Sequence, residues 1–203
     1  MRKVIAVLIL IGLAALLIIN PGIYSRKDVD NTDMLYDSNI TEEEILQLAE
    51  ADQGVLDFGV TSLQESPEQL VRFNAMIMKV MYGSEDVLLS EEEIISLAKI
   101  QRKYMHPELL ALNPESEHLK GVVGEAQKAH EEESWIIDFN VLAPDYSHSD
   151  PTTVATVKVA FVPNSFDSTD DIYMRYLVEK NEEGLWFIKG WVALDADDYI
   201  VIE

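Results

Sequence analysis

The chain has 203 residues, of which 15 are Lys or Arg and 37 are Asp or Glu, for a formal net charge of −22. From Asp28 onward, 11 basic residues stand against 37 acidic residues, a net charge of −26. This excess repels polyphosphates and anionic lipid, so nucleic acid is excluded as an expected partner. It also keeps a domain soluble and monomeric. Because the chain has no cysteine, neither a disulfide nor a lipid-modified cysteine can form.

An apolar run dominates residues 1–24. After Arg2 and Lys3, residues 4–19 are 16 consecutive apolar or glycine residues. As a helix this run is roughly 24 Å long, slightly short of the roughly 30 Å of bilayer hydrocarbon. We therefore expect residues 1–24 to form a transmembrane helix that serves as a signal-anchor, with a cleaved signal peptide as the alternative. Residues 4–19 would then contact the membrane.

The orientation of this segment is not decided by charge, since Arg2 and Lys3 on one side are matched by Arg26 and Lys27 on the other. A short basic flank ahead of an apolar run is typical of secretory and signal-anchor segments. On that ground we expect a single-pass protein whose soluble domain is extracytoplasmic.

The remaining chain divides by composition into three parts. Residues 25–40 are polar, rich in turn formers and without periodicity, which indicates a linker. Residues 41–194 have a length that suits one domain. Residues 195–203 form an acidic C-terminal tail, for which a solvated surface segment is the simplest interpretation.

Three capping boxes mark predicted helix starts in the first half of the domain, since in each the hydroxyl and the third-position side chain satisfy unpaired backbone donors. Apolar residues recur at helical spacing after the second and third boxes. Glycine ends the first of these helices at position 83, and the pair His106 and Pro107 ends the next. The boxes pair Thr41 with Glu44, Ser66 with Gln69, and Ser90 with Glu93.

A third substantial helix is predicted after Pro114, with Asn113 as its N-cap. Gly121 and Gly124 fall inside it, where glycine lowers helix stability. Close packing against a neighbour and a frayed helix are both consistent with these two glycines.

The second half of the domain changes to the two-residue alternation of half-buried strands. The sequence NEEG at residues 181–184 predicts a tight turn before the last strand. Helices followed by an antiparallel meander predict an α+β fold, with helices packed on a curved, mainly antiparallel four-stranded sheet that forms a cone-shaped roll. The predicted strands cover residues 135–142, 155–161, 172–179 and 185–194.

Alternation in the first strand predicts that Trp135, Ile137 and Phe139 face the helices. Asp138 and Asn140 then face solvent. The inward faces of all four predicted strands read as apolar.

Several segments carry a resemblance to known families. The ending NEEGLWFIKGW, after helices and long strands, is similar to the cone-shaped roll of the nuclear-transport-factor-two-like and cystatin-like folds. The segments SPEQLVRFNAMIMKVMYG, SEEEIISLAKIQRKYMHPELLALNPESEHLK and GLWFIKGW resemble an uncharacterised family of single-span extracytoplasmic bacterial proteins, a domain of unknown function. The resemblance covers roughly residues 41–194. It implies a fold and a place in the bacterial cell membrane, and no reaction.

Enzymes of the wider superfamily, such as ketosteroid isomerases and dehydratases, place an Asp, His or Tyr inside the apolar mouth of the cone. Because the inward faces here read as apolar, no catalytic residue is predicted. The side chains that remain for the mouth of a pocket are Tyr104, His106, Tyr146 and His148.

No cofactor or metal is expected. His106, His118 and His130 recur every 12 residues, but successive members are turned by roughly 120° on a helix, so they would not share a face. The sequence also contains no Walker loop, GxGxxG or GxSxG motif.

These patterns predict a membrane-anchored extracytoplasmic binding or interaction module, whose partner is a protein, a peptide or a small apolar ligand. One alternative is a small-molecule isomerase or hydrolase that uses the interior of the cone. Another is a structural module that associates when residues 199–203 (YIVIE) add as a strand to a neighbour's sheet edge. The sequence leaves the oligomeric state open.

Overall fold

The computed structural model describes residues 41–50, 63–83, 88–146, 152–164 and 171–199. The expected transmembrane segment, the linker and His148 lie outside these ranges, as do residues 200–203. Within them, none of the helices combines the length and the apolar character that a bilayer crossing needs.

The predicted α+β class and the four-stranded antiparallel sheet are confirmed. The strands follow one another in the order β1-β2-β3-β4, and each pairs antiparallel with the next. Every strand end lies within two residues of its predicted position. Their bounds are β1 Ile136–Val141, β2 Val154–Pro163, β3 Ile172–Lys180 and β4 Trp186–Leu194.

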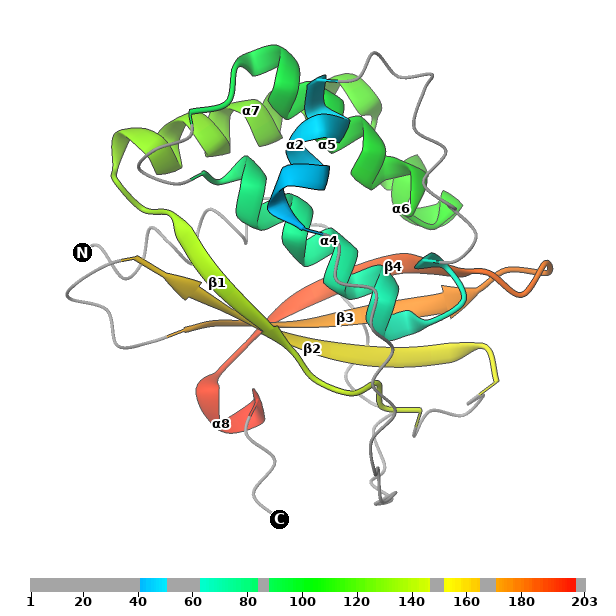
Figure 1. Ribbon diagram of the computed structural model, residues 1–203. Helices are drawn as coiled ribbons and strands as arrows, with labels where there is room; N and C mark the ends of the chain where they lie inside the picture. Colours follow the sequence, from blue (N-terminus) through cyan, green and yellow to red (C-terminus); the bar gives the residue numbers. More distant parts are fainter. Residues whose placement is uncertain (1–40, 51–62, 84–87, 147–151, 165–170, 200–203) are drawn as a thin grey trace.

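The helices cover one face of the twisted sheet, and one short helix lies on the opposite side (Figure 1). Of the covering helices, α4 makes the most extensive contact with the sheet, α6 also contacts β4, and the others pack farther from the sheet. The short helix on the far side is α8, Ala196–Tyr199, which the sequence analysis did not predict. The covering helices are α2 Glu42–Glu50, α4 Pro67–Met81, α5 Glu91–Lys103, α6 Pro107–Leu112 and α7 Glu115–Glu131.

The capping boxes at Thr41 and Ser90 are formed. At the start of α5, Ser90 N–H donates to Glu93 Oε2 at 2.6 Å, and Glu93 N–H donates to Ser90 Oγ at 3.3 Å. At α4, the Ser66 hydroxyl accepts the backbone N–H of Gln69 at 3.5 Å. Each contact satisfies a donor that the first turn of a helix leaves unpaired.

The prediction that Asn113 caps α7 is wrong. Pro114 holds the N-cap position of α7, and it makes no side-chain capping bond. Asn113 instead follows α6, where its Nδ2 donates to the carbonyl of Leu109 at 3.0 Å. An Asn–Pro pair between two helices can end the first or begin the second, and here its amide satisfies a carbonyl of the first.

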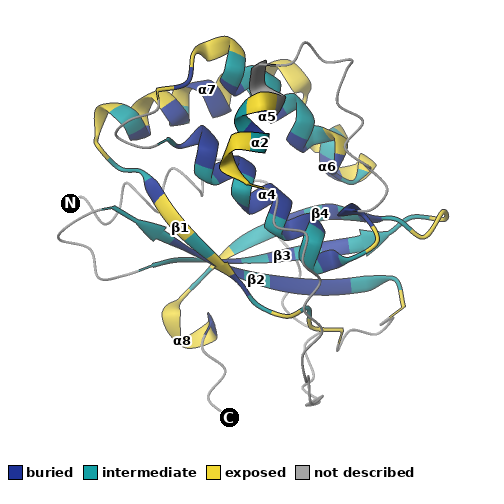
Figure 2. Ribbon diagram, viewed as in Figure 1, coloured by how far each residue is buried: buried dark blue, intermediate teal, exposed yellow. Residues whose placement is uncertain are grey.

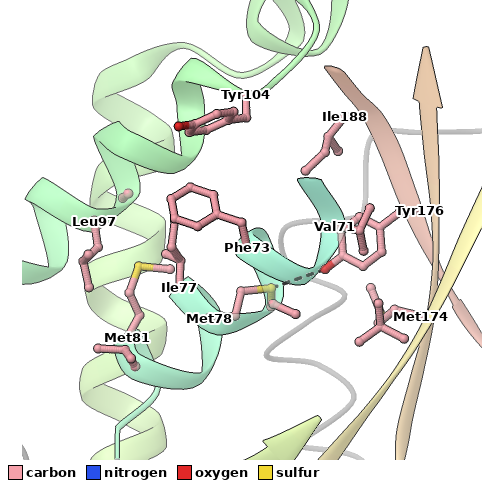
Figure 3. Close-up of a cluster of buried hydrophobic side chains, with 14 of the residues drawn as sticks. Val71, Phe73, Ile77, Met78, Met81, Leu97, Tyr104, Met174, Tyr176 and Ile188 are labelled. Atoms are coloured by element: carbon pink, nitrogen blue, oxygen red, sulfur yellow. Dashed lines mark hydrogen bonds between the residues drawn. The ribbon is translucent and has the colours of Figure 1, made fainter. Parts of the chain in front are cut away.

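The core is formed between α4 and the sheet (Figure 2). The apolar stripe of α4 is fully buried at Leu70 and Ile77, as the sequence predicted. Phe73 packs edge-on against Tyr104 from the end of α5, with ring centroids 5.1 Å apart. Figure 3 shows these side chains filling the space between α4, α5 and the sheet.

The prediction that Ile137 faces the core is wrong. The pairing of β1 with β2 shifts register between Ile136 and Asp138, so one residue of β1 is extra. Such a bulge interrupts the alternation of side chains, which places Ile136 in the core and leaves Ile137 51% exposed. Asp138 and Asn140 are exposed, as predicted.

The outer edge of β4 is occupied by other parts of the chain. Ile188 N–H donates to the Tyr104 carbonyl, and His106 N–H donates to the Ile188 carbonyl, both at 2.8 Å. Trp186 N–H donates to the Gln64 carbonyl at 2.9 Å. Backbone groups that would otherwise be open to another strand are therefore satisfied along this part of the edge.

Gly121 and Gly124 lie on the exposed face of α7, and a Cβ added at either would meet nothing within 4 Å. Close packing therefore does not explain them in the described part of the chain. We predict that Gly121→Ala and Gly124→Ala each raise the free energy of unfolding by roughly 0.5–1 kcal/mol, because alanine loses less backbone entropy in a helix. Urea denaturation measures the change.

Gly184 supplies the matched control for these two substitutions. It also has open space around its Cα, but its φ is +83°, in the left-handed region. Gly184→Ala should lower the free energy of unfolding by about 1 kcal/mol. A loss of stability at Gly121 and Gly124 as well would contradict the helical explanation.

Candidate functional site

Three polar side chains meet inside the structure, although the sequence predicted apolar inward faces. Gln101 of α5 donates its Nε2 to Asn74 Oδ1 of α4 at 2.8 Å. Asn74 Nδ2 donates to Tyr176 Oη of β3 at 3.2 Å. The Tyr176 hydroxyl donates to the sulfur of Met78 at 3.3 Å, the contact drawn as a dashed line in Figure 3. We call Asn74, Gln101 and Tyr176 the interior polar cluster.

The cluster is fully enclosed, since each of its three side chains is at most 7% exposed. Burial raises the pKa of the Tyr176 hydroxyl well above its ordinary value, and the hydrogen bond from Asn74 offsets a part of this rise. Tyr176 is therefore a neutral phenol at any physiological pH. It links the sheet to α4 by hydrogen bonds and is not poised to transfer a proton.

A cavity of about 10 Å³ lies beside the cluster. This volume accommodates about one water molecule. Its polar lining comes from the cluster together with Tyr82 and His118, and its other lining residues are apolar. A substrate of several carbon atoms does not fit into a space of this size.

His118 of α7 is buried beside a cation. Its Nδ1 lies 3.2 Å from Nη1 of Arg102, which also donates to the carbonyl of Asn113 at 3.0 Å. Burial, and next the charge of Arg102, lower the pKa of His118 from 6.5 to about 4. The imidazole is therefore neutral near pH 7, so Nδ1 accepts the guanidinium N–H and joins α7 to α5.

Glu125 is the second titratable side chain that α7 turns toward the core. The hydroxyl of buried Tyr82, the C-cap residue of α4, donates to Glu125 Oε2 at 3.2 Å. Burial raises the pKa of Glu125 from 4.5 to about 7, although the Tyr82 hydrogen bond and the charge of Lys128 act in the opposite direction. The carboxyl is thus partly protonated at neutral pH, which makes the contact between α4 and α7 sensitive to pH.

The three described candidates for a pocket mouth lie in three different settings. Tyr104 is a core residue, 5% exposed. His106 is the N-cap of α6, where its Nδ1 accepts the N–H of Glu108 at 3.3 Å. Tyr146 is 42% exposed and its ring lies 6.3 Å from that of Trp186. His148 is outside the described residues.

The residues that the sequence analysis missed had a weak signal. Gln101 stands at helical spacing among the apolar residues of its helix, and Tyr176 alternates with the apolar residues Met174 and Val178 of its strand. His118 lies four residues before Val122, on the buried stripe of α7. A polar residue inside an apolar stripe indicates a buried polar group, but spacing alone does not identify its partner from another element.

In the part of the chain that the structure describes, His, Asp and Glu side chains do not gather in groups of three that could hold a metal ion. The interior polar cluster offers neutral amide and phenol groups, which suit hydrogen bonding better than they suit a divalent cation.

A family model with the description "Domain of unknown function (DUF6715)" matches residues 60–191. The chain belongs to this family. The match confirms the predicted membership of an uncharacterised family, and its range contains the interior polar cluster, His118 and Glu125. Neither the curated proteins nor the solved structures include a match to this chain. The DUF6715 region ends before α8 begins.

Asn74 should be the residue of the cluster on which stability depends most, because it bonds both of the others. We predict that Asn74→Ala lowers the free energy of unfolding by about 2–4 kcal/mol, since it leaves buried polar groups unpaired and enlarges the cavity. Urea denaturation tests this. Gln127→Ala, at an exposed position of α7, is the control and should change stability by less than about 0.5 kcal/mol. An equal effect of both substitutions would contradict the role of the cluster.

The Glu125 carboxyl should make stability fall as the pH rises. Its pKa is raised in the folded protein, so its contribution is fully present below pH 4.5 and is lost as the pH rises through about 7. We predict that Glu125→Gln removes this loss. The urea midpoint of the variant should therefore rise relative to that of the wild type between pH 4.5 and 8. Glu131→Gln, an exposed carboxyl on the same helix, should run parallel to the wild type. Parallel curves for Glu125→Gln would exclude the buried carboxyl as the cause.

Proposed function

We propose that this chain is a membrane-anchored, extracytoplasmic binding or interaction module, and that its partner binds on the outer surface of the domain. The supporting observation is the small size of the cavity beside the interior polar cluster, in the part of the chain that the structure describes. The cavity between α4, α5, α7 and β3 has room for about one water, and the polar groups that line it already have hydrogen-bond partners. A partner larger than water therefore has to meet the surface.

The anchor rests on the apolar run of residues 4–19. A hydrophobic segment of this length, with a basic flank and no charge inside it, supports membrane insertion. The single span, the bacterial membrane and the cone-shaped roll implied by the resemblance belong to this proposal. A protein or peptide partner fits better than a nucleic acid, because the surface is strongly acidic.

The alternative of a small-molecule isomerase lacks an equivalent observation. An enzyme of that kind needs an apolar pocket of several hundred Å³ and a paired acid or base that reaches the ligand. Glu125 has a suitable pKa, but its carboxyl already accepts a hydrogen bond from the Tyr82 hydroxyl at the end of α4.

The anchor and its orientation are testable in intact cells. We predict that the full chain stays in the membrane pellet after alkaline carbonate washing, and that protease added to intact cells digests the domain. Leu10→Arg together with Leu13→Arg should release the chain into the soluble fraction, because each arginine at the centre of a span costs about 2.5–3.5 kcal/mol. Replacing Leu88 and Leu112, exposed apolar residues of the domain, with Arg is the matched control and should leave the chain in the pellet.

Two results would contradict the proposal. Recovery of the wild-type chain in the soluble fraction would exclude the anchor. Protection of the domain until the cells are lysed would place it on the cytoplasmic side. The binding role itself requires a stoichiometric partner that crosslinks to the full chain in native membranes, and whose yield falls with increasing salt as expected for an acidic surface.

A further inference from the structure

The short helix α8 lies on the face of the sheet opposite to the other helices (Figure 1). Its last residue, Tyr199, is only 8% exposed, although it is not part of the main core. The Tyr199 ring lies 4.6 Å from the ring of Tyr173 on β3, with 33° between the ring planes. Lys158 of β2 donates its Nζ to the carbonyl of Asp198 at 2.5 Å.

These contacts, and not the helix itself, keep α8 in place. A helix of four residues does not persist in water on its own, since helices shorter than about 12 residues are marginal even for good formers. Asp197 and Asp198 are exposed, so Tyr199 is the side chain by which α8 is buried. The C-terminal segment is thus a short peptide that is bound to a site on its own domain.

The site and the segment carry opposite charges. Lys158 and Arg175 are paired in register on β2 and β3, and both alternate with buried residues, so they lie on the outer face with Tyr173. The segment, with the sequence DADDY at residues 195–199, brings three carboxylates and one aromatic ring. Lys158 and Tyr173 of the sheet thus contact a segment that is acidic and carries an aromatic ring.

We infer that the outer sheet surface formed by Tyr173, Lys158 and Arg175 is a docking site for the C-terminal segment of this chain, and that a second copy can supply this segment in trans. The structure shows the site filled in cis. Exchange of an identical segment between copies needs no new contact, which makes it a low-cost route to association. This inference goes beyond the proposed function and does not depend on the membrane anchor.

The segment bound in cis determines how strongly a segment from outside can bind to the same site. A segment joined to its site by a short connection has an effective concentration on the order of millimolar, so the cis form competes strongly with any peptide added from outside. Removal of the Tyr199 ring from the full chain that receives the peptide, here called the host, should therefore open its site to a peptide added in trans. Binding to the wild-type chain should remain at least about tenfold weaker.

A labelled peptide of residues 194–203 tests this by fluorescence anisotropy with the full chain in detergent micelles. The Tyr199→Ala host should bind it at least about tenfold more tightly than the wild-type host does. The same peptide with Tyr199→Ala, and a host that carries both Tyr199→Ala and Tyr173→Ala, should bind at least about tenfold more weakly. Equal binding by wild-type and Tyr199→Ala hosts, or no binding to a folded Tyr199→Ala host up to about 1 mM, would overturn the inference.

A second measurement needs no substitution. In a mixture of isotope-labelled and unlabelled wild-type chains near 1 mM, filtered NMR spectra should show contacts between the Tyr173 ring of one copy and the Tyr199 ring of another. If these contacts occur only within one copy, exchange between copies is excluded.

Discussion

Helix α4 is the element on which the rest of the structure depends, because it lies between the sheet and the outer helices. Its apolar stripe covers the inner face of the sheet, and ten of its 15 residues are buried. A helix buried on this scale has no solvent-facing side at Asn74, so this residue needs partners from both layers. It finds them in Gln101 and Tyr176, which fixes the rotation of α4 between α5 and β3.

The acidic excess is compatible with this fold because of where the charges lie. Glutamates are grouped in the first turns of α2 and α5, where the positive end of the helix dipole and the capping bonds favour them. The pKa values of Glu44 and Glu93 are lowered by hydrogen bonds from Thr41 and Ser90, which keeps both carboxyls ionised. Glu125 is the opposite case, since burial raises its pKa. Among the described residues, the carboxylates lie mainly on the surface, and Glu125 is a partly buried exception at the contact between α4 and α7.

The structural features that could be predicted from the sequence are those that depend on a local residue pattern. Helix starts, the Asn181 to Gly184 turn and four strands follow from capping residues and alternation, because these signals act within a few residues. The position of Ile137 was mispredicted because a bulge depends on the partner strand. The cluster around Asn74 escaped prediction because it joins residues 27 and 102 positions apart. Composition suggested a solvated tail after Leu194, yet one aromatic side chain in it is buried.

The two faces of the sheet are thus covered in different ways. On the inner face, alternating residues such as Val157 and Met174 are fully buried under α4. On the outer face, Tyr173 and Lys158 are half-buried, and the described covering element is α8. A face closed by several long helices is permanent, because its opening would expose the core. On the outer face, the contacts of α8 with the described residues include one aromatic contact and one hydrogen bond outside the main core, so its detachment would leave that core covered.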